Sequence, residues 1–333
     1  MIKNTKQAVV RRILRNRDGL PGESGHAFAP ANIALCKYWG KRNAELNLPV
    51  TASLSVSLGE LGSEVELVVV GRRDVCILNG RELPADSNFA RRATEFLNLF
   101  RPTRNTGFRM TAINSIPTAA GLASSASGFA ALTLALDRLF GWRLTPAELS
   151  ILARLGSGSA CRSIHPGFVK WRGGTRADGM DSHAAPIKAC WPGFCLGLVV
   201  LTEAEKAVSS RAAMNRTTAT SILYRAWPEQ VRRDMREITA AIRTRDFPRL
   251  GAAAEANALA MHATMIAARP PVFYWQPASV AIMQRVWTLR GKGLALYFTM
   301  DAGSNLKLLF LERDAACVRR LFPGVRIVRP FGL

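Results

Sequence analysis

Two turns of small residues in this sequence stand where they can hold an anionic substrate. The stretch IPTAAGLASSASGFAAL (116–132) combines glycine, alanine and serine at the expected start of a helix, where free N–H groups and the helix dipole attract anions. A second small-residue turn, GSGSACRS (156–163), contains Arg162, and arginine grips carboxylates and phosphates through paired hydrogen bonds. The other cations in the short motifs are Lys37, Lys41 and Arg211. Together these residues predict a pocket for several anionic groups.

The first of these turns admits two interpretations. Gly121 lets the backbone approach a phosphate closely, and the hydroxyls of Ser124, Ser125 and Ser127 can donate hydrogen bonds to it. The same small side chains would also let a helix pack tightly against a sheet. The stretch lacks the G-x-x-x-x-G-K-[ST] pattern, so it is not a P-loop.

One carboxylate stands out in FTMDAGSNLK (298–307). Asp301 follows an apolar strand and precedes a glycine turn, a place from which a carboxylate can orient or deprotonate a substrate hydroxyl. Aspartate is also a common turn former, and Asp301 taken alone fits that role better.

Alternating strands and helices must position these residues, and their order predicts an α+β fold in two domains. Asn79-Gly80 predicts a hairpin turn, and Thr145 with Glu148 predicts a capped helix start. The expected strands are 51–61, 63–80, 108–116, 167–171, 194–202 and two within 294–312. The expected helices are 87–100, 124–139, 145–155, 209–227, 228–244, 247–262, 277–293 and 315–321. We expect a flexible basic extension over 1–25, an N-terminal domain over 26–190 and a C-terminal domain over 191–333.

Composition narrows the class of protein. The 333 residues carry 45 Lys and Arg against 24 Asp and Glu, a formal charge of +21, which suits anionic partners such as phosphorylated metabolites or nucleic acid. The charges are dispersed, and a solvated basic surface explains most of them. Six scattered cysteines without a C-x-x-C pair indicate reduced thiols of an intracellular protein. No apolar run is long enough for a transmembrane helix, and four histidines without ligand spacing argue against a zinc site.

In combination, the motifs resemble those of the mevalonate diphosphate decarboxylases, members of the galactokinase/homoserine kinase/mevalonate kinase/phosphomevalonate kinase superfamily. KYWGK together with SGSACRS is specific to the decarboxylase branch. The matching pieces occur in the family's order over about 27 to 312: ANIALCKYWGKRN (31–43), NLPVTASLSVSL (47–58), 116–132, GSGSACRSI (156–164), KAVSSRAAMNRTTATS (206–221), EANALAMHAT (255–264), PPVFYW (270–275) and FTMDAGSNLK (298–307).

The resemblance implies a fold and an activity. The fold is the superfamily's two-domain α+β fold, with a ribosomal-protein-S5-like N-terminal domain, a ferredoxin-like C-terminal domain and an active-site cleft between them. The activity is the ATP-dependent decarboxylation of mevalonate 5-diphosphate to isopentenyl diphosphate, with ADP, phosphate and CO₂ as the other products. The resemblance also implies a homodimer. From composition and the retained catalytic set we expect a cytoplasmic protein without a membrane partner or a nucleic-acid partner.

Site residues follow from the resemblance, motif by motif. Asp301 is expected to orient or deprotonate the tertiary hydroxyl, Lys37 to pair with it, and Arg162 with Asn32 to hold the substrate carboxylate. The 5-diphosphate is expected on Tyr38, Lys41, Ser157, Ser159, Ser210 and Arg211. ATP is expected on Gly121, Leu122, Ala123, Ser124, Ser125 and Ser127. Mg²⁺ needs no dedicated protein site, because the ATP phosphates hold it, with the Ser125 hydroxyl as a candidate further ligand.

Departures from the family pattern leave alternatives open. The sequence has Thr51-Ala52 where relatives carry asparagine, His165-Pro166-Gly167 where they read Phe-Gly-Gly, and Ser304 where they have proline. None of these removes a charged catalytic group. They leave a 5-phosphomevalonate decarboxylase as an alternative. A mevalonate or phosphomevalonate kinase is a second alternative on this scaffold, and the presence of Asp301, Lys37 and Arg162 together argues against it. The excess positive charge motivates a third alternative, a pseudoenzyme that binds nucleic acid or an anionic surface.

Overall fold

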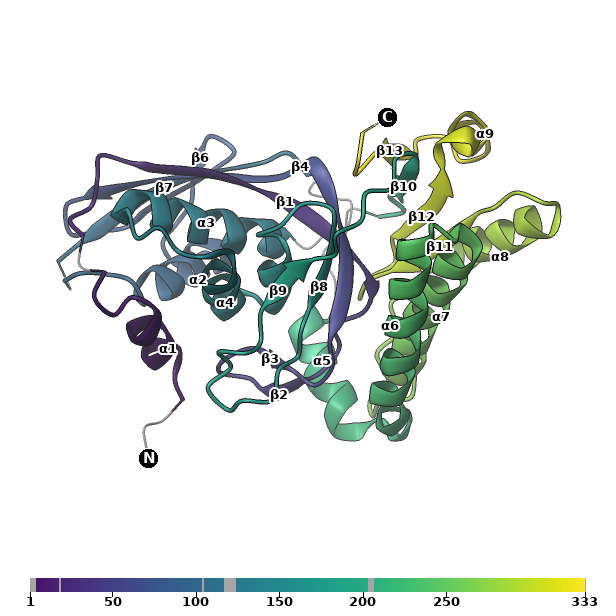
Figure 1. The fold of residues 1–333 in the computed structure, drawn as a ribbon, viewed down its shortest axis with the longest axis horizontal. Helices are drawn as coiled ribbons and strands as arrows, with labels where there is room; N and C mark the ends of the chain where they lie inside the picture. Colours follow the sequence, from purple (N-terminus) through teal and green to yellow (C-terminus); the bar gives the residue numbers. More distant parts are fainter. Residues whose placement is uncertain (1–3, 18, 104, 117–123, 203–206, 333) are drawn as a thin grey trace.

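The computed structural model describes residues 4–17, 19–103, 105–116, 124–202 and 207–332. The N-terminal half is built on a seven-stranded sheet with helices packed against it (Figure 1). Its strands are β1 (Gly25–Cys36), β4 (Ser53–Val70), β5 (Val75–Leu78), β6 (Arg81–Glu82), β7 (Gly107–Asn114), β8 (Phe168–Trp171) and β9 (Ala184–Pro186); a separate hairpin pairs β2 (Lys41–Asn43) with β3 (Leu48–Pro49). Its helices are α1 (Lys6–Ile13), α2 (Asn88–Leu97), α3 (Ser124–Phe140) and α4 (Pro146–Gly156), followed by a 3-10 turn over Gly158–Arg162.

The long strand β4 organises this sheet. One edge of β4 pairs with β1 along most of its length, and the other edge pairs with β7 at one end and β8 at the other. The strand order is β6-β5-β7-β4-β8-β9, antiparallel except for the β5–β7 pair. Since β1 pairs with the start of β4 at Cys36, the chain leaves the sheet at Lys37 beside β8, where the candidate motifs gather.

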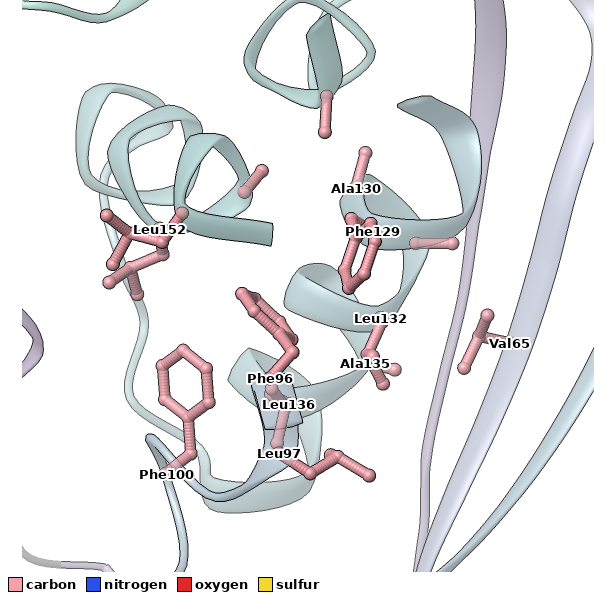
Figure 2. Packing of buried hydrophobic residues seen from close by; sticks show 14 of the residues in the cluster. Val65, Phe96, Leu97, Phe100, Phe129, Ala130, Leu132, Ala135, Leu136 and Leu152 are labelled. Atoms are coloured by element: carbon pink, nitrogen blue, oxygen red, sulfur yellow. The ribbon is translucent and has the colours of Figure 1, made fainter. Parts of the chain in front are cut away.

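Helices α2, α3 and α4 share an apolar core (Figure 2). Phe96 of α2 meets Phe129 of α3 edge-on, with ring centroids 5.1 Å apart, and Leu152 of α4 belongs to the same cluster. Ala130 and Ala135 of α3 have no exposed surface. The small residues of α3 therefore do pack tightly, which was one of the two interpretations of its sequence.

The C-terminal half has a four-stranded antiparallel sheet in the order β11-β12-β10-β13. With helices between β10 and β11 and between β12 and β13, this is the β-α-β-β-α-β arrangement of a ferredoxin-like domain. The strands are β10 (Phe194–Val199), β11 (Tyr297–Met300), β12 (Leu306–Leu311) and β13 (Arg326–Val328). The helices are α5 (Ser210–Thr220), α6 (Trp227–Thr244), α7 (Phe247–Ile266), α8 (Pro277–Gly291) and α9 (Ala315–Leu321), with 3-10 turns over Ile222–Ala226 and Glu312–Asp314.

A second apolar cluster joins the two halves. It includes Ile33 of β1, Val56 of β4, Val231 of α6 and Met261 of α7, all of them buried. Helices α6 and α7 therefore lie against β1 and β4 at the junction (Figure 1), and residues of all four elements share this cluster. This packing brings the residue after β1, Lys37, close to the residue after β11, Asp301. Among the described helices, none is long and apolar enough to cross a membrane.

Most predicted elements are confirmed, with a few corrections. The Asn79-Gly80 turn joins β5 to β6 with positive φ at both residues, and Thr145 caps α4 through the expected capping box. The two strands predicted over 51–61 and 63–80 are mostly one strand, β4, followed by the short β5. The predicted helix 209–227 ends at Thr220, because a 3-10 turn follows. The strand β1 was expected only as an extended start near residue 26, and the short strands β2, β3, β9 and β13 were not predicted.

The prediction of a flexible extension over residues 1–25 is wrong for its described part. Thr5 caps α1 by accepting a hydrogen bond from the N–H of Ala8, and Val9, Val10 and Ile13 are buried in the first core cluster. Arg12 pairs with Asp178 at 2.8 Å, and Arg17 pairs with Glu148 at 3.0 Å. The apolar face of α1 was too short for the sequence alone to show that it packs into the domain.

Candidate active site

Asp301 lies at the centre of the candidate site, between two lysines. Its Oδ1 is 2.9 Å from Nζ of Lys37, and its Oδ2 is 3.4 Å from Nζ of Lys307. Both lysine side chains are 2% exposed, whereas the Asp301 side chain is 32% exposed. Only the carboxylate can therefore meet a substrate, and the two ammonium groups behind it favour its ionised form.

Lys37 is held at the junction by hydrogen bonds from both halves. Its Nζ donates to the carbonyl oxygen of Ala34 at 2.8 Å, and its backbone N–H donates to Oδ1 of Asn257 on α7 at 2.7 Å. Asn257 in turn donates to Asp234 of α6 at 2.7 Å. Burial lowers the pKa of Lys37, and the charge and hydrogen bond of Asp301 oppose that shift. The pair is thus mutually dependent, since the ammonium group is costly to bury without its carboxylate.

His262 fixes the backbone at Asp301. Its Nε2 lies 3.0 Å from the carbonyl oxygen of Asp301, so this nitrogen carries the proton and donates. Burial lowers the pKa of His262 to about 4, which leaves the imidazole neutral near neutral pH. No catalytic role was predicted for His262, and the structure gives it a positioning role through the backbone of Asp301.

Arg162 is buried among neutral hydrogen-bond acceptors. Its guanidinium donates to Oγ of Ser53 at 2.6 Å, to Oγ of Ser55 at 3.0 Å and to Oδ1 of Asn32 at 3.2 Å. The indole of Trp171 lies 6.0 Å from the Arg162 guanidinium carbon. Within the described part of the chain Arg162 forms no ion pair, and burial lowers its pKa. A buried guanidinium without a carboxylate partner fits an anionic group brought by a ligand.

Asn32 orients this guanidinium. Its Nδ2 donates to Oγ of Ser163 at 2.8 Å, which leaves its Oδ1 turned to Arg162. The Asn32–Arg162 contact joins β1 to the 3-10 turn after α4, as the motifs predict. Two further residues of the contact set, Ser53 and Ser55, were missed, because alternate serines in a strand carry no signal of their own.

A second group of cations, which we call the four-cation cluster, consists of Lys6, Lys41, Arg92 and Arg211. Burial lowers the pKa of Lys41 to about 8, with a further lowering by the charges of Arg211, Lys6 and Arg92. Burial and the charge of Arg211 likewise lower the pKa of Lys6 and of Arg92. Among the described residues, none of the four forms an ion pair.

The predicted serine turn lies against Tyr38. A methyl group on Gly158 would come within 2.7 Å of the Tyr38 ring, so only glycine lets the turn approach this closely. The Tyr38 hydroxyl is buried, and no described residue forms a hydrogen bond with it. Oγ of Ser157 lies 3.5 Å from Oγ of Ser159 and 3.4 Å from Oγ of Ser125. These hydroxyls can serve a ligand that lies between the turn and the start of α3.

The nucleotide residues are only partly visible. Gly121, Leu122 and Ala123 lie outside the described residues. Ser124 and Ser125 open α3, and the first turn of that helix holds no acidic side chain, which suits an anion. Ser127 does not fit the predicted role, because its hydroxyl is buried and contacts Ser63 of β4 at 2.7 Å. Ser127 thus packs α3 on the sheet.

The structure brings predicted residues together in three groups: Lys37 with Asp301, Asn32 with Arg162, and Ser125 with Ser157 and Ser159. Ser210 opens α5 beside Arg211, and its side chain forms no hydrogen bond with described residues. The residues that the sequence did not single out are Lys6, Ser53, Ser55, Arg92, Asn257, His262 and Lys307. Across the described ranges, no group of three His, Cys, Asp or Glu side chains is placed to hold a metal ion.

Comparison with known proteins gives a consistent result for both halves. A family model for the diphosphomevalonate decarboxylase-like N-terminal domain matches residues 29–184, and one for the mevalonate 5-diphosphate decarboxylase C-terminal domain matches residues 196–325. A diphosphomevalonate decarboxylase of Aspergillus fumigatus is 37% identical over 87% of this chain and 77% of its own length. That of Danio rerio is 37% identical over 89% of this chain and 79% of its own length.

Solved structures agree with these relatives. A structure described as MDDEF in complex with MVAPP, AMPPCP and magnesium is 40% identical, covers 93% of this chain and 98% of its own, and superposes with a TM-score of 0.85. Mevalonate diphosphate decarboxylase from Staphylococcus aureus is 35% identical over 92% of this chain and 95% of its own, with a TM-score of 0.87. The paired lysines at Asp301, the buried Arg162 and these matches over both halves lead to one conclusion: the chain belongs to the diphosphomevalonate decarboxylase family and has its two-domain superfamily fold.

Proposed function

We propose that this protein converts mevalonate 5-diphosphate and ATP into isopentenyl diphosphate, ADP, phosphate and CO₂. The observation that carries the proposal is the Lys37–Asp301–Lys307 arrangement, with the buried Arg162 close enough for its charge to interact with Asp301. The first group suits a hydroxyl that must be phosphorylated, and the second suits a carboxylate that must be held. Mevalonate 5-diphosphate has both groups: the hydroxyl is on the tertiary carbon, and the carboxylate is on a side chain of that carbon.

Asp301 acts on the tertiary hydroxyl. The carboxylate accepts a hydrogen bond from that hydroxyl, aligns its oxygen and takes its proton as the new O–P bond forms. Lys37 and Lys307 favour the ionised carboxylate and hold it in position. His262 holds the backbone from which the carboxylate projects.

Arg162 acts on the substrate carboxylate during the second stage. When the tertiary phosphate leaves, positive charge develops on the tertiary carbon, and the C–C bond to the carboxylate supplies the electron pair for the new double bond. The carboxyl group leaves as neutral CO₂. Arg162 grips the carboxylate in the ground state, and its existing bonds to Ser53, Ser55 and Asn32 stabilise the guanidinium once that carboxylate is lost.

ATP with Mg²⁺ supplies the phosphoryl group that turns the hydroxyl into a leaving group. On this chain, Ser124 and Ser125 at the start of α3 would hold its phosphates, together with Gly121, Leu122 and Ala123. The hydroxyl of Ser125 is the candidate for a contact with Mg²⁺, because it lies near Ser157 at the expected phosphate position. The solved relative in complex with AMPPCP and magnesium supports ATP and Mg²⁺ as the ligands.

A diphosphate suits the site better than a monophosphate. The four-cation cluster and the Tyr38 hydroxyl gather more positive charge and more donors than one phosphate needs. A kinase without decarboxylation would not need the buried Arg162 beside Asp301. A pseudoenzyme that only binds nucleic acid is disfavoured, because it would not need the Lys37–Asp301–Lys307 arrangement beside the buried Arg162. The cytoplasmic location and the homodimer remain predictions.

The test follows ADP and CO₂ together from purified protein with Mg-ATP. Mevalonate, its 5-phosphate and its 5-diphosphate are offered in turn. Equal amounts of ADP and CO₂ from the diphosphate alone are the expected result. ADP without CO₂ would make the protein a kinase, and CO₂ from the 5-phosphate would make it a monophosphate decarboxylase.

A further inference from the structure

We propose that Lys6, the first residue of α1, is a ligand of the substrate's terminal phosphate groups and strengthens the preference for a diphosphate. This inference rests on the proposed function, because it places the 5-diphosphate at the four-cation cluster. The family models match only from residue 29 onward, so Lys6 lies outside the segments that define the family. It was also absent from the residues that the sequence motifs singled out.

The position of Lys6 is fixed by the packing of α1. Val9, Val10 and Ile13 are buried against the N-terminal core, and Arg12 is tied to Asp178. The N–H of Lys6 donates to Oε1 of Glu45 at 3.3 Å. The start of α1 therefore lies against the β2–β3 hairpin.

That hairpin also carries Lys41, so Lys6 and Lys41 are both positioned by the β2–β3 hairpin. Nζ of Lys41 donates to Oδ1 of Asn47 at 2.7 Å, and Nδ2 of Asn47 donates to the carbonyl oxygen of Arg154 at 2.9 Å. Lys41 is thus fixed from the N-terminal core, as Lys6 is. The charge of Lys6 lowers the pKa of Lys41, in keeping with their positions beside one hairpin.

Stability does not explain this arrangement of charges. Lys6 stands at the first position of α1, and Arg211 stands at the second position of α5. Cations there oppose the helix dipole, which favours negative charge at a helix N-terminus. Glu45 and Glu95 partly offset the charge of Lys6, but neither lies close enough to form an ion pair with it.

A bound anion would offset the repulsion among the four cations and the unfavourable interaction of Lys6 and Arg211 with the dipoles of their helices. The buried Tyr38 hydroxyl, which has no hydrogen-bond partner among the described residues, feels the charge of Arg211 and supplies a donor at the same place. A diphosphate carries more charge than a monophosphate and spans more of the cluster. Lys6 supplies the extra cation that the larger group can use.

The experiment compares Lys6→Met with Arg11→Met. Methionine keeps the apolar stem and a high helix propensity, so α1 should remain packed. Arg11 is exposed on the same helix and serves as the matched control, since its removal changes the net charge equally. Lys6→Arg restores the positive charge. Each variant is assayed for KM and kcat with the 5-diphosphate, and for Kd with inorganic pyrophosphate and inorganic phosphate by calorimetry.

We expect Lys6→Met to raise KM and the pyrophosphate Kd by about tenfold, with kcat, the ATP KM and the melting temperature little changed. Phosphate binding should change less, and Lys6→Arg should recover most of the loss. Equal behaviour of Lys6→Met and Arg11→Met would overturn the proposal. If wild-type protein fails to turn over the 5-diphosphate, the proposed function fails, while the pyrophosphate comparison still decides whether Lys6 binds a diphosphate.

Discussion

The lowered pKa of Lys41 gives a prediction that can be checked over a narrow pH range. Burial and three neighbouring cations bring this pKa to about 8, so near neutral pH the amine is still charged and ready for a diphosphate. As pH rises through that value, the substrate-free protein loses the charge. The 5-diphosphate should then bind only to the fraction of protein in which Lys41 is protonated. The apparent affinity for the 5-diphosphate should therefore fall above about pH 8.

The magnitude follows from the protonated fraction of Lys41. With a pKa of about 8, that fraction falls from about nine-tenths at about pH 7 to about one-tenth at about pH 9, so KM for the 5-diphosphate should rise about tenfold. The value of kcat should change little, because the bound diphosphate raises the pKa of Lys41 and keeps it protonated. Arginine remains charged throughout, so Lys41→Arg should show a flat KM.

The assay measures initial rates of ADP release across this range at saturating Mg-ATP. Calorimetry in two buffers of different ionisation enthalpy should show proton uptake when the 5-diphosphate binds near pH 8. The ATP KM, measured over the same range, is the internal control. A flat wild-type KM would refute the reasoning, and an equal slope in Lys41→Arg would assign the titration to another group.

Three further predictions concern the catalytic carboxylate, the buried guanidinium and the neutral imidazole. Asp301→Asn should lower kcat by about a thousandfold while nucleotide affinity, measured by calorimetry, stays within about twofold; near wild-type turnover would exclude Asp301 as the proton acceptor. Arg162→Lys should raise KM for the 5-diphosphate by about tenfold or more with little change for ATP, because one ammonium group cannot replace the bonds to Ser53, Ser55 and Asn32; equal losses for both ligands would indicate a structural role. The pKa of His262 is lowered to about 4 in the folded protein, so on acidification the unfolded chain binds a proton first. The free energy of unfolding should therefore fall by about 3 kcal/mol as pH drops from about 6.5 toward about 4. Urea unfolding of wild type and His262→Gln should show this extra acid sensitivity only in wild type.

Thermal unfolding is the control shared by the variants at Asp301 and Arg162. Asp301→Asn leaves two nearly buried lysines without their carboxylate, so a loss of stability of about 3 kcal/mol is expected in addition to the loss of turnover. A variant that melts below the assay temperature says nothing of catalysis. In that case, Lys307→Met is the alternative variant. It removes the cation beside Oδ2 of Asp301, keeps the carboxylate and its contact with Lys37, and should destabilise the fold less.

Local patterns in the sequence were enough for most elements and for the principal site residues. Asn79-Gly80 specified its hairpin because both residues tolerate positive φ, and Thr145 with Glu148 specified a helix start through their own hydrogen bonds. Asp301, Lys37 and Arg162 were found because each sits in a short motif of distinctive composition. Such features depend on neighbours within a few residues of the chain.

Residues whose roles depend on distant neighbours were found only in the structure. Lys307 is separated from Lys37 by most of the chain, and only the packing of β11 and β12 against the N-terminal half places both on Asp301. Ser127 lies in the phosphate motif, yet the rotation of α3 turns its hydroxyl to Ser63. Lys6 and Arg92 carry no motif at all.

The sequence by itself therefore determined the family, the strand and helix order and the charged residues available for chemistry. The tertiary structure decided which of those charges share a site. The physical reason is range: turn geometry, capping and periodicity act over a few residues, whereas burial and Coulomb interaction depend on the final packing of the whole chain. The N-terminal helix shows this most clearly, since three buried residues convert an apparent basic tail into the support for Lys6.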